Sequence, residues 1–132
     1  MKKKKIIIVL IVIIGALLII LGAKAYLETN LEGLTDLPIS NVDLSKMKDG
    51  IYVGSYKAFP VEAIVKVTVM SDKIAAIELV KHSNGKGAKA EIIPSKVIEA
   101  QSLEVDLVSG ATYSSKVILK AIEAALINTN KE

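Results

Sequence analysis

The 132-residue chain has room for one small domain and short appended segments, and its formal net charge is +3. It contains no cysteine, which excludes a disulfide framework, a thiolate-bound metal and anchoring through a lipid-modified cysteine. All 17 basic residues are lysines. Without an arginine fork, a bound phosphate must be held by backbone, hydroxyl or ammonium groups.

The N-terminal segment of the chain is basic at its start and then strongly hydrophobic. Residues 2–5 are lysines, and residues 6–23 contain no charged or strongly polar side chain. As an α-helix, this apolar run spans about 27 Å, close to the thickness of a bilayer core. The positive-inside rule keeps residues 1–5 in the cytoplasm and places the rest of the chain outside. We therefore predict a cytoplasmic basic leader (1–5), a transmembrane signal anchor (6–23) and a single-pass protein of the cell membrane with an extracytoplasmic C-terminal domain.

A cleaved secretory signal peptide is the alternative for this leader. Ala23-Lys24-Ala25 is a small-x-small triplet that allows cleavage after Ala25. The apolar region of a signal peptide usually runs only about 7–15 residues, so the length favours the anchor. Outside the leader lysines the chain is close to neutral, which argues against a nucleic-acid partner.

Residues 24–41 are mixed in character and are predicted to form a stalk, with one helical turn near residues 26–31, before a domain over residues 42–132. The Asp49-Gly50 turn signal precedes a strand predicted over residues 51–58. Tyr52 and Tyr56 share one face of this strand with Gly54 between them. That gap can admit a ring or a neighbouring backbone, or it can be filled by one of the tyrosines.

The next segment is predicted to be an antiparallel hairpin of strands 61–70 and 74–81, joined by a tight connection at residues 71–73. Together with strand 51–58 it gives a three-stranded sheet with one buried face. The residues expected on that face are Val61, Ala63, Val65, Val67 and Val69 of the first strand, and Ala75, Ile77 and Leu79 of the second.

Residues 82–87 are predicted to form a loop that contains His82, two glycines and a lysine. This loop is either an exposed connection with no task or a segment that lines a cofactor at the sheet edge. One histidine and no cysteine argue against a metal site.

Helices are expected after the sheet. Pro94 is suited to the first position of a helix over residues 94–101, which follows a short helix-prone stretch at 88–93. Residues 102–106 are expected to be extended. A last helix over residues 113–128 carries an apolar stripe at three- and four-residue spacing. Its Lys116, Lys120 and Glu123 are expected on the solvated side. The predicted class is α+β: a small antiparallel sheet packed by two helices, preceded by one N-terminal transmembrane helix.

Asp106-Leu107-Val108-Ser109-Gly110-Ala111-Thr112 precedes the last helix. The Gly-Ala pair delivers the Thr112 hydroxyl to the first helical turn. Backbone N–H groups there lack internal partners and the helix dipole is positive, so a phosphate is stabilised. On spacing alone, an ordinary hydroxyl cap after a glycine turn explains the same residues.

This stretch resembles the flavinylation motif Asp-x-x-Ser/Thr-Gly-Ala-Thr/Ser, and it matches at every fixed position. The Tyr113-Ser114-Ser115 continuation, the Asp49-Gly50-x-Tyr52-x-Gly54 start and Gln101-Ser102 are also similar. The chain therefore resembles, over residues 42–126, the FMN-binding domain of the C subunit of sodium-translocating quinone reductase and the G subunit of the Rnf complex. Small membrane-anchored extracellular flavoproteins of Gram-positive bacteria carry the same domain.

The resemblance implies FMN joined by a phosphoester to the Thr112 hydroxyl. A separate FMN transferase, which is extracytoplasmic and magnesium-dependent, makes this bond in the family with FAD as donor. Cofactor contacts are then expected from Asp106, Ser109, Gly110, Ala111, Tyr113 and Ser114, and on the isoalloxazine side from Tyr52 and His82. The family's better-known loops have Thr-Pro after the histidine, where this chain has Ser83-Asn84-Gly85.

The function expected is that of an extracytoplasmic, membrane-anchored electron-transfer flavoprotein. It would be an electron carrier or a component of a redox complex rather than a complete enzyme, because no catalytic residue is evident. Its electron donor and acceptor would lie in the membrane or outside it. Two alternatives stay open: a module that binds flavin or another anion non-covalently at the same helix start, and a structural subunit in which the turn only caps a helix.

Overall fold

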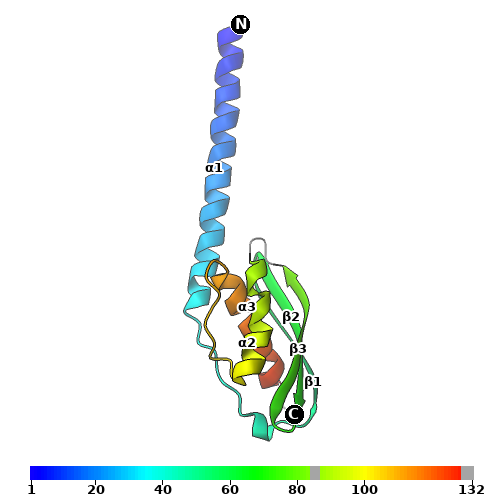
Figure 1. Ribbon diagram of the computed structural model, residues 1–132. Coiled ribbons are helices and arrows are strands. Elements are labelled where there is room, and N and C mark those ends of the chain that lie inside the picture. The colour runs from blue at the N-terminus through cyan, green and yellow to red at the C-terminus, as the bar shows by residue number, and fades with distance from the viewer. Residues whose placement is uncertain (84–86, 129–132) are drawn as a thin grey trace.

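The computed structural model describes residues 1–83 and 87–128, except for the side chain of Asn30. One long helix leads into a small two-layer domain (Figure 1). The elements in chain order are α1 (Lys2–Thr35), η1 (Leu44–Lys46), β1 (Gly50–Ala58), β2 (Val61–Met70), β3 (Lys73–Ser83), η2 (Ala88–Ile92), α2 (Ile93–Ala100) and α3 (Thr112–Ile127). Residues 102–111 link α2 to α3 without forming a strand.

The three strands form an antiparallel sheet in the order β1-β2-β3, which confirms the predicted α+β class. Ser71 and Asp72 join β2 to β3 with φ values of 52° and 62°. Two successive left-handed residues make the turn whose twist matches a tight hairpin. Five alternate residues of β2, from Val61 to Val69, are buried as predicted.

The prediction for Ala75 is wrong. Val69 pairs with Ile74, whereas Thr68 pairs with Ala76, so Ala75 is the extra residue of a β-bulge. Ile74 therefore takes the buried position and Ala75 is exposed. The bulge is held by Gln101, whose side-chain amide accepts from Ile74 N–H at 2.8 Å and donates to Ile74 C=O at 2.9 Å.

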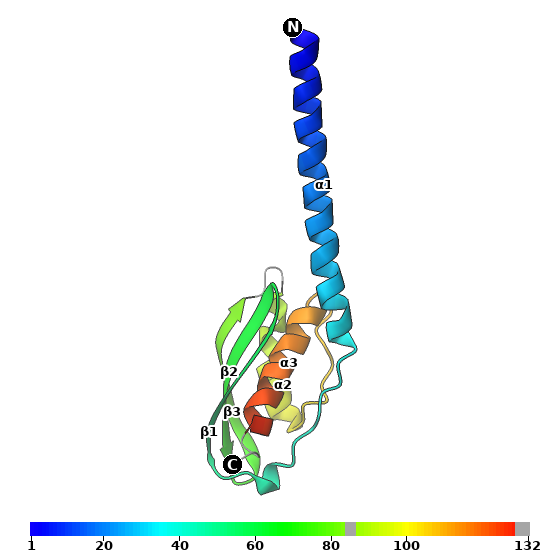
Figure 2. The same ribbon diagram turned by 180° about the vertical axis from the view of Figure 1, so that it is seen from behind.

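Both helices of the domain cover the same face of the sheet. α3 packs on β1 and β2, and α2 packs on β3 (Figures 1 and 2). Gly54 explains how closely α3 approaches, because a Cβ at this position would lie 2.1 Å from Ala121 O and 2.3 Å from Ala125 N. The gap between Tyr52 and Tyr56 is therefore filled by the backbone of α3, and not by a ring or by one of the tyrosines.

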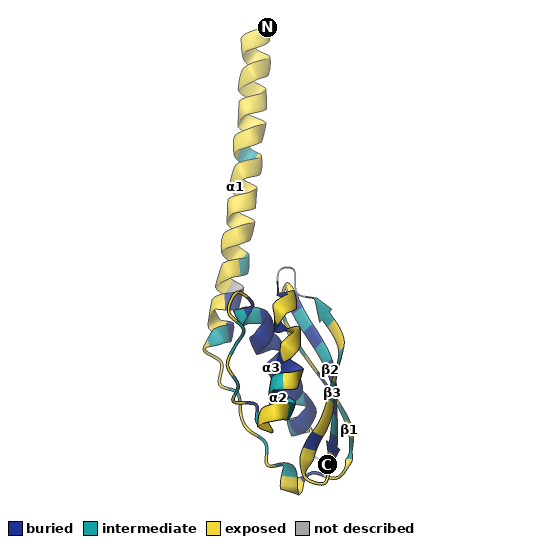
Figure 3. Ribbon diagram, in the orientation of Figure 1, coloured by how far each residue is buried: buried dark blue, intermediate teal, exposed yellow. Residues whose placement is uncertain are grey.

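α1 runs without a break from Lys2 to Thr35, through the segment expected to be a stalk with a single helical turn. Its N-terminal part is long and apolar enough to cross a membrane, and its side chains are exposed along this part (Figure 3). Leu31 and Leu34, by contrast, are buried in the domain's hydrophobic cluster. The end of this helix is thus a part of the domain core as well as a spacer.

The polar side of α3 is covered, contrary to expectation. Lys116 and Glu123 are buried and Lys120 is half-buried. The chain leaving α1 is bonded to two of them: Ser40 N–H donates to Glu123 Oε1 at 2.7 Å, and Lys120 Nζ donates to Pro38 C=O at 3.3 Å. Lys120 also pairs with Glu123. These charged groups fasten the segment after α1, which a helical periodicity alone could not reveal.

Replacing Gly54 with alanine should destabilise the fold by about 3 kcal/mol or more, because the new methyl group meets helix backbone rather than a flexible side chain. Thermal unfolding of the full chain in detergent, followed by circular dichroism, measures the effect.

Gly33→Ala is the matched control, since a Cβ at this exposed helical position would meet nothing within 4 Å. We expect it to be neutral or to stabilise by about 0.5–1 kcal/mol. Equal melting temperatures for the two variants would contradict the close approach at Gly54.

Candidate functional site

The motif loop ends in a tight turn that aims the chain into α3. Ala111 N–H donates to Val108 C=O at 2.9 Å, and Gly110 has φ of +80°. A positive φ at the third residue of such a turn favours glycine. A Cβ on Gly110 would meet nothing within 4 Å, so the glycine serves the backbone conformation and not a close contact. Thr112 follows as the first residue of the helix.

The start of α3 has no side-chain cap. Its cap position is Ala111, and the backbone N–H groups of residues 112–114 have no hydrogen-bond partner among the residues described. The ordinary explanation of Thr112 as a hydroxyl cap is therefore wrong. Three free donors at the positive end of a 16-residue helix make this a favourable place for an anion.

The Thr112 hydroxyl is available for chemistry. It makes no hydrogen bond within the described part of the chain, and Thr112 is half-buried. A hollow of about 330 Å³ lies beside it, lined by Thr35, Gly110, Thr112 and Tyr113. Thr35 is the last residue of α1, so this hollow lies between the domain and the end of the long helix.

Ser115 fastens the turn to the helix. Its fully buried hydroxyl donates to Ala111 C=O at 2.7 Å and accepts from Val108 N–H at 3.0 Å. Ser115 was expected only as part of a similar continuation, without a role. The spacing of seven residues between Val108 and Ser115 crosses a turn and a helix start, so no sequence pattern indicates this contact.

Asn41 is hydrogen-bonded to the N-terminal end of the loop that carries the motif. Its side chain accepts from Leu103 N–H at 3.0 Å and donates to the Ser102 hydroxyl at 3.1 Å. The residues leaving α1 therefore run beside the start of the loop that carries the motif. Since Asn41 lies in the segment predicted to be a stalk, this segment also helps to place the motif.

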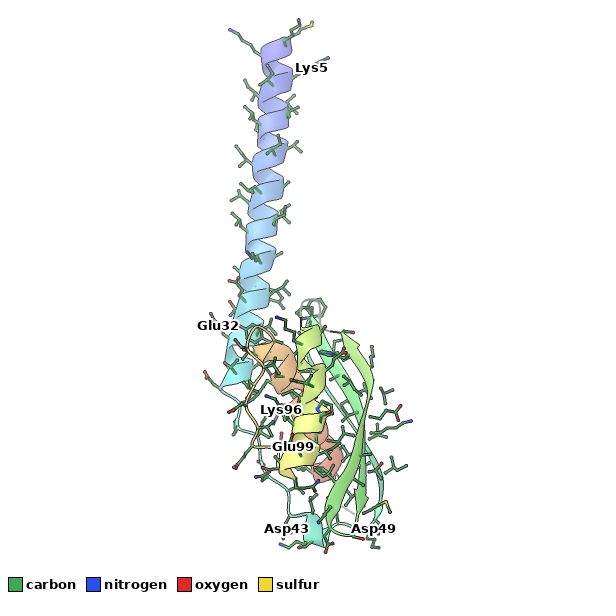
Figure 4. The ribbon with its side chains drawn as sticks, viewed as in Figure 1. Lys5, Glu32, Asp43, Asp49, Lys96 and Glu99 are labelled. Atoms are coloured by element: carbon green, nitrogen blue, oxygen red, sulfur yellow. The ribbon has the colours of Figure 1, made fainter. Side chains whose placement is uncertain are left out.

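Asp106 and Ser109 are exposed on the loop and do not line the hollow beside Thr112. Asp106 instead borders a second hollow of about 410 Å³, together with Glu99, Glu104 and Lys96. Lys96 Nζ lies 3.4 Å from Asp106 C=O, and Lys96 and Glu99 come from α2 (Figure 4). The Asp106 carboxylate therefore lies on the outer surface of the domain, away from the Thr112 hydroxyl.

Tyr52 and His82, the two residues expected on the isoalloxazine side, lie on different strands of the sheet, β1 and β3. Tyr52 donates its hydroxyl to Lys48 C=O and lies far from Thr112. Tyr56 faces Lys120, and Gly54 faces Ala121 and Ala125, so Tyr52 lies towards the C-terminal end of α3. Thr112 is at the opposite end, more than about 13 Å along the helix.

His82 belongs to β3 rather than to an exposed loop. A second bulge, between the pairs Ile64–Lys81 and Val65–Leu79, turns His82 to the same face as Ala63, which is the buried one. Its side chain is only 2% exposed, and Nδ1 lies 3.2 Å from Glu91 Oε1 of η2. Ser83 is the last residue of β3 and Gly87 is buried, while residues 84–86 of the predicted cofactor-lining loop lie outside the described residues.

Removing the Ser115 hydroxyl should loosen the turn that presents Thr112. Ser115→Ala leaves Val108 N–H without its acceptor, and we expect a loss of about 2 kcal/mol. Ser114→Ala is the control, because Ser114 is equally buried but its side chain makes no hydrogen bond with the described residues. Thermal unfolding of both variants checks this. A Ser115→Ala chain as stable as Ser114→Ala would contradict the role of the hydroxyl.

Comparisons with known proteins identify three distantly related chains. The chain is 33% identical over 85 residues to an uncharacterised protein of Treponema pallidum, covering 62% of this chain and 24% of that protein. It is 28% identical to an NADH:acrylate oxidoreductase of Vibrio harveyi, covering 83% and 11% of the two chains. With an NADH:fumarate oxidoreductase of Klebsiella pneumoniae it shares 29% identity, with coverage of 66% and 10%.

The chain thus spans from a quarter down to a tenth of the length of these relatives. No solved structure matches it. The FMN-binding domain family matches residues 60–127, which include β2, β3, both helices of the domain, and the whole motif from Asp106 to Thr112. The chain therefore belongs to the FMN-binding domain family.

Proposed function

We propose that this protein is a membrane-anchored electron-transfer flavoprotein that carries FMN through a phosphoester on Thr112. The observation that carries the proposal is the setting of this hydroxyl. It occupies the first position of α3, at the last position of the matched motif. Beside it are a hollow and the N–H groups of residues 112–114, which have no partner among the described residues.

The start of α3 suits the product of such a modification. Joining the Thr112 oxygen to the phosphorus of the FMN half of FAD breaks the phosphoanhydride, releases AMP and frees the hydroxyl proton. The resulting diester keeps one negative charge, which the helix dipole and the N–H groups of residues 112–114 stabilise. A covalent bond also prevents loss of the flavin by dilution outside the cell.

The chain's residues supply attachment and position, while the bound flavin supplies the redox chemistry. The half-buried Tyr113 lines the hollow, and Ser115 and Asn41 hold the loop at both ends. Two relatives are named as oxidoreductases, and this chain corresponds to about a tenth of each. The names of these relatives support a redox role for the domain, and we propose that this role is that of an electron carrier or a component of a redox system.

We also propose that α1 anchors this domain on the extracytoplasmic side. The helix is long and apolar enough to span a membrane, and four lysines precede its apolar run. We retain residues 1–5 as a cytoplasmic leader, 6–23 as the span, 24–41 as the connection and 42–132 as the FMN-binding domain. An FMN transferase that uses FAD, together with a donor and an acceptor of electrons, would be the partners.

Thr112→Ala should abolish covalent FMN without unfolding the protein, because the Thr112 hydroxyl makes no hydrogen bond with other described residues. The chain is co-expressed with an FMN transferase and its intact mass is measured. Thr112→Ser should keep the adduct, and Ser114→Ala is a control for a nearby hydroxyl on the same helix turn.

An adduct that survives Thr112→Ala would contradict the attachment point. Flavin that co-purifies with the wild-type chain but is lost on denaturation would favour the non-covalent alternative. The free N–H groups at the start of α3 are compatible with that mode of anion binding as well.

The absence of native cysteine makes the sidedness directly testable. Single substitutions Lys3→Cys and Glu99→Cys place a thiol in the leader and on exposed α2. On intact cells, a membrane-impermeant maleimide should label Glu99→Cys and leave Lys3→Cys unlabelled until the cells are opened. The reverse pattern would contradict the proposed orientation.

A further inference from the structure

The hollow beside Thr112 is built from two parts of the chain that are far apart in sequence. Gly110, Thr112 and Tyr113 line it from the domain, and Thr35 lines it from the last turn of α1. The family match covers residues 60–127 and assigns nothing to α1. Thr35 therefore lies outside both the motif and the residues matched by the family.

The end of α1 is fixed against the domain. Leu31 and Leu34 are 9% and 3% exposed, and both belong to the core cluster. After the helix, Pro38 C=O and Ser40 N–H are bonded to Lys120 and Glu123 of α3. Leu27, which is half-buried, extends the apolar stripe of α1 by one more turn. The last turn of α1, which lines the hollow, therefore keeps a constant position relative to Thr112.

The hollow also has a defined orientation. α3 begins at the end of the domain from which α1 leaves, as both views show (Figures 1 and 2). Thr35 follows the last residue of the apolar run, Ala23, by 12 residues, which is about 18 Å of helix. The start of α3 is therefore on the side of the domain that faces the proposed membrane.

From these contacts we infer that the last turn of α1 is the second wall of the flavin site. This inference rests on the proposed attachment of FMN to Thr112. The flavin chain then lies between the domain and its own anchor helix, with Thr35 as a contact residue. The Thr35 hydroxyl donates to Glu32 C=O at 3.0 Å, so its oxygen still has room to accept from a ribityl hydroxyl.

The size of the hollow fits this arrangement. At about 330 Å³ it is at the small end of the range for ligand pockets. It can take the phosphate and part of the ribityl chain, which leaves the isoalloxazine at its mouth. A ring held there lies on the membrane side of the domain and within reach of a substituent at position 35.

The test places an indole at position 35. Thr35→Trp and Thr29→Trp are compared with the wild-type full chain, each co-expressed with the FMN transferase and purified in detergent. Thr29 is a matched control because it is on the same helix and its hydroxyl likewise bonds a helical carbonyl, Ala25 C=O, at 2.9 Å. It is exposed and does not line the hollow.

Three quantities are measured: the intact mass, the flavin fluorescence per bound flavin and the melting temperature. In folded Thr35→Trp we expect either a loss of the adduct, because the hollow is filled, or a fall in flavin fluorescence to about half or less, because the indole stacks on the ring. Thr29→Trp should load and fluoresce as the wild type does.

Thr35→Trp that loads and fluoresces like Thr29→Trp would overturn the inference and leave the attachment at Thr112 intact. A wild-type chain without any adduct would overturn both. If Thr35→Trp does not fold, Thr35→Val replaces it, with accessibility of the flavin to iodide as the readout. An iodide quenching constant equal to that of Thr29→Val would then overturn the inference.

Discussion

The contact between Gly54 of β1 and the backbone of α3 positions the helix that begins at the proposed flavin site. The absent side chain lets Ala121 and Ala125 approach the strand more closely than any other residue would allow. This contact sets the distance between α3 and the sheet, and it also sets the position of α3 along the strands. Because the helix cannot slide, its first turn is held at one end of the domain, where Thr112 meets the end of α1.

The opposite side of α3 is as important as the side on the sheet. Glu123 and Lys120 are polar residues with limited exposure, and each of them binds backbone of the segment that follows α1. Buried charges are stabilised only when they are paired and hydrogen-bonded. Here the pairing has a structural consequence, because it joins the segment that follows α1 to α3, the helix that begins at Thr112. The end of α1, the motif loop and the start of α3 are thus held together.

The sequence predicted the elements well and their environments less well. Strict alternation in β2 and the apolar stripe of α3 indicated the sheet, its buried face and the covering helix. The bulge at Ala75 could not be predicted, because it depends on Gln101, which follows Ile74 by 27 residues. The Gln101 side chain bonds the N–H and C=O groups of Ile74 in place of a neighbouring strand. The same holds for His82, whose face was set by a second bulge.

The residues of the candidate site were likewise predicted only in part. The motif identified Thr112 and the need for Gly110, because both follow from local backbone geometry. It did not indicate Ser115, Asn41 or Thr35, whose roles arise from contacts across the fold. Leu27, Leu31 and Leu34 did carry a signal, since spacings of four and three residues define one helical face. That face marks the segment as packed rather than as a solvated stalk.

The most direct measurement is the location of the flavin on the native chain. Cleavage after lysine releases residues 97–116 as one peptide, which contains Thr112 together with four serines and Tyr113. Fragmentation of this peptide by tandem mass spectrometry separates these hydroxyls. The proposed attachment predicts that the FMN-phosphoryl mass is on Thr112. A flavin on another hydroxyl, or a fully unmodified peptide from cells that contain the transferase, would contradict it.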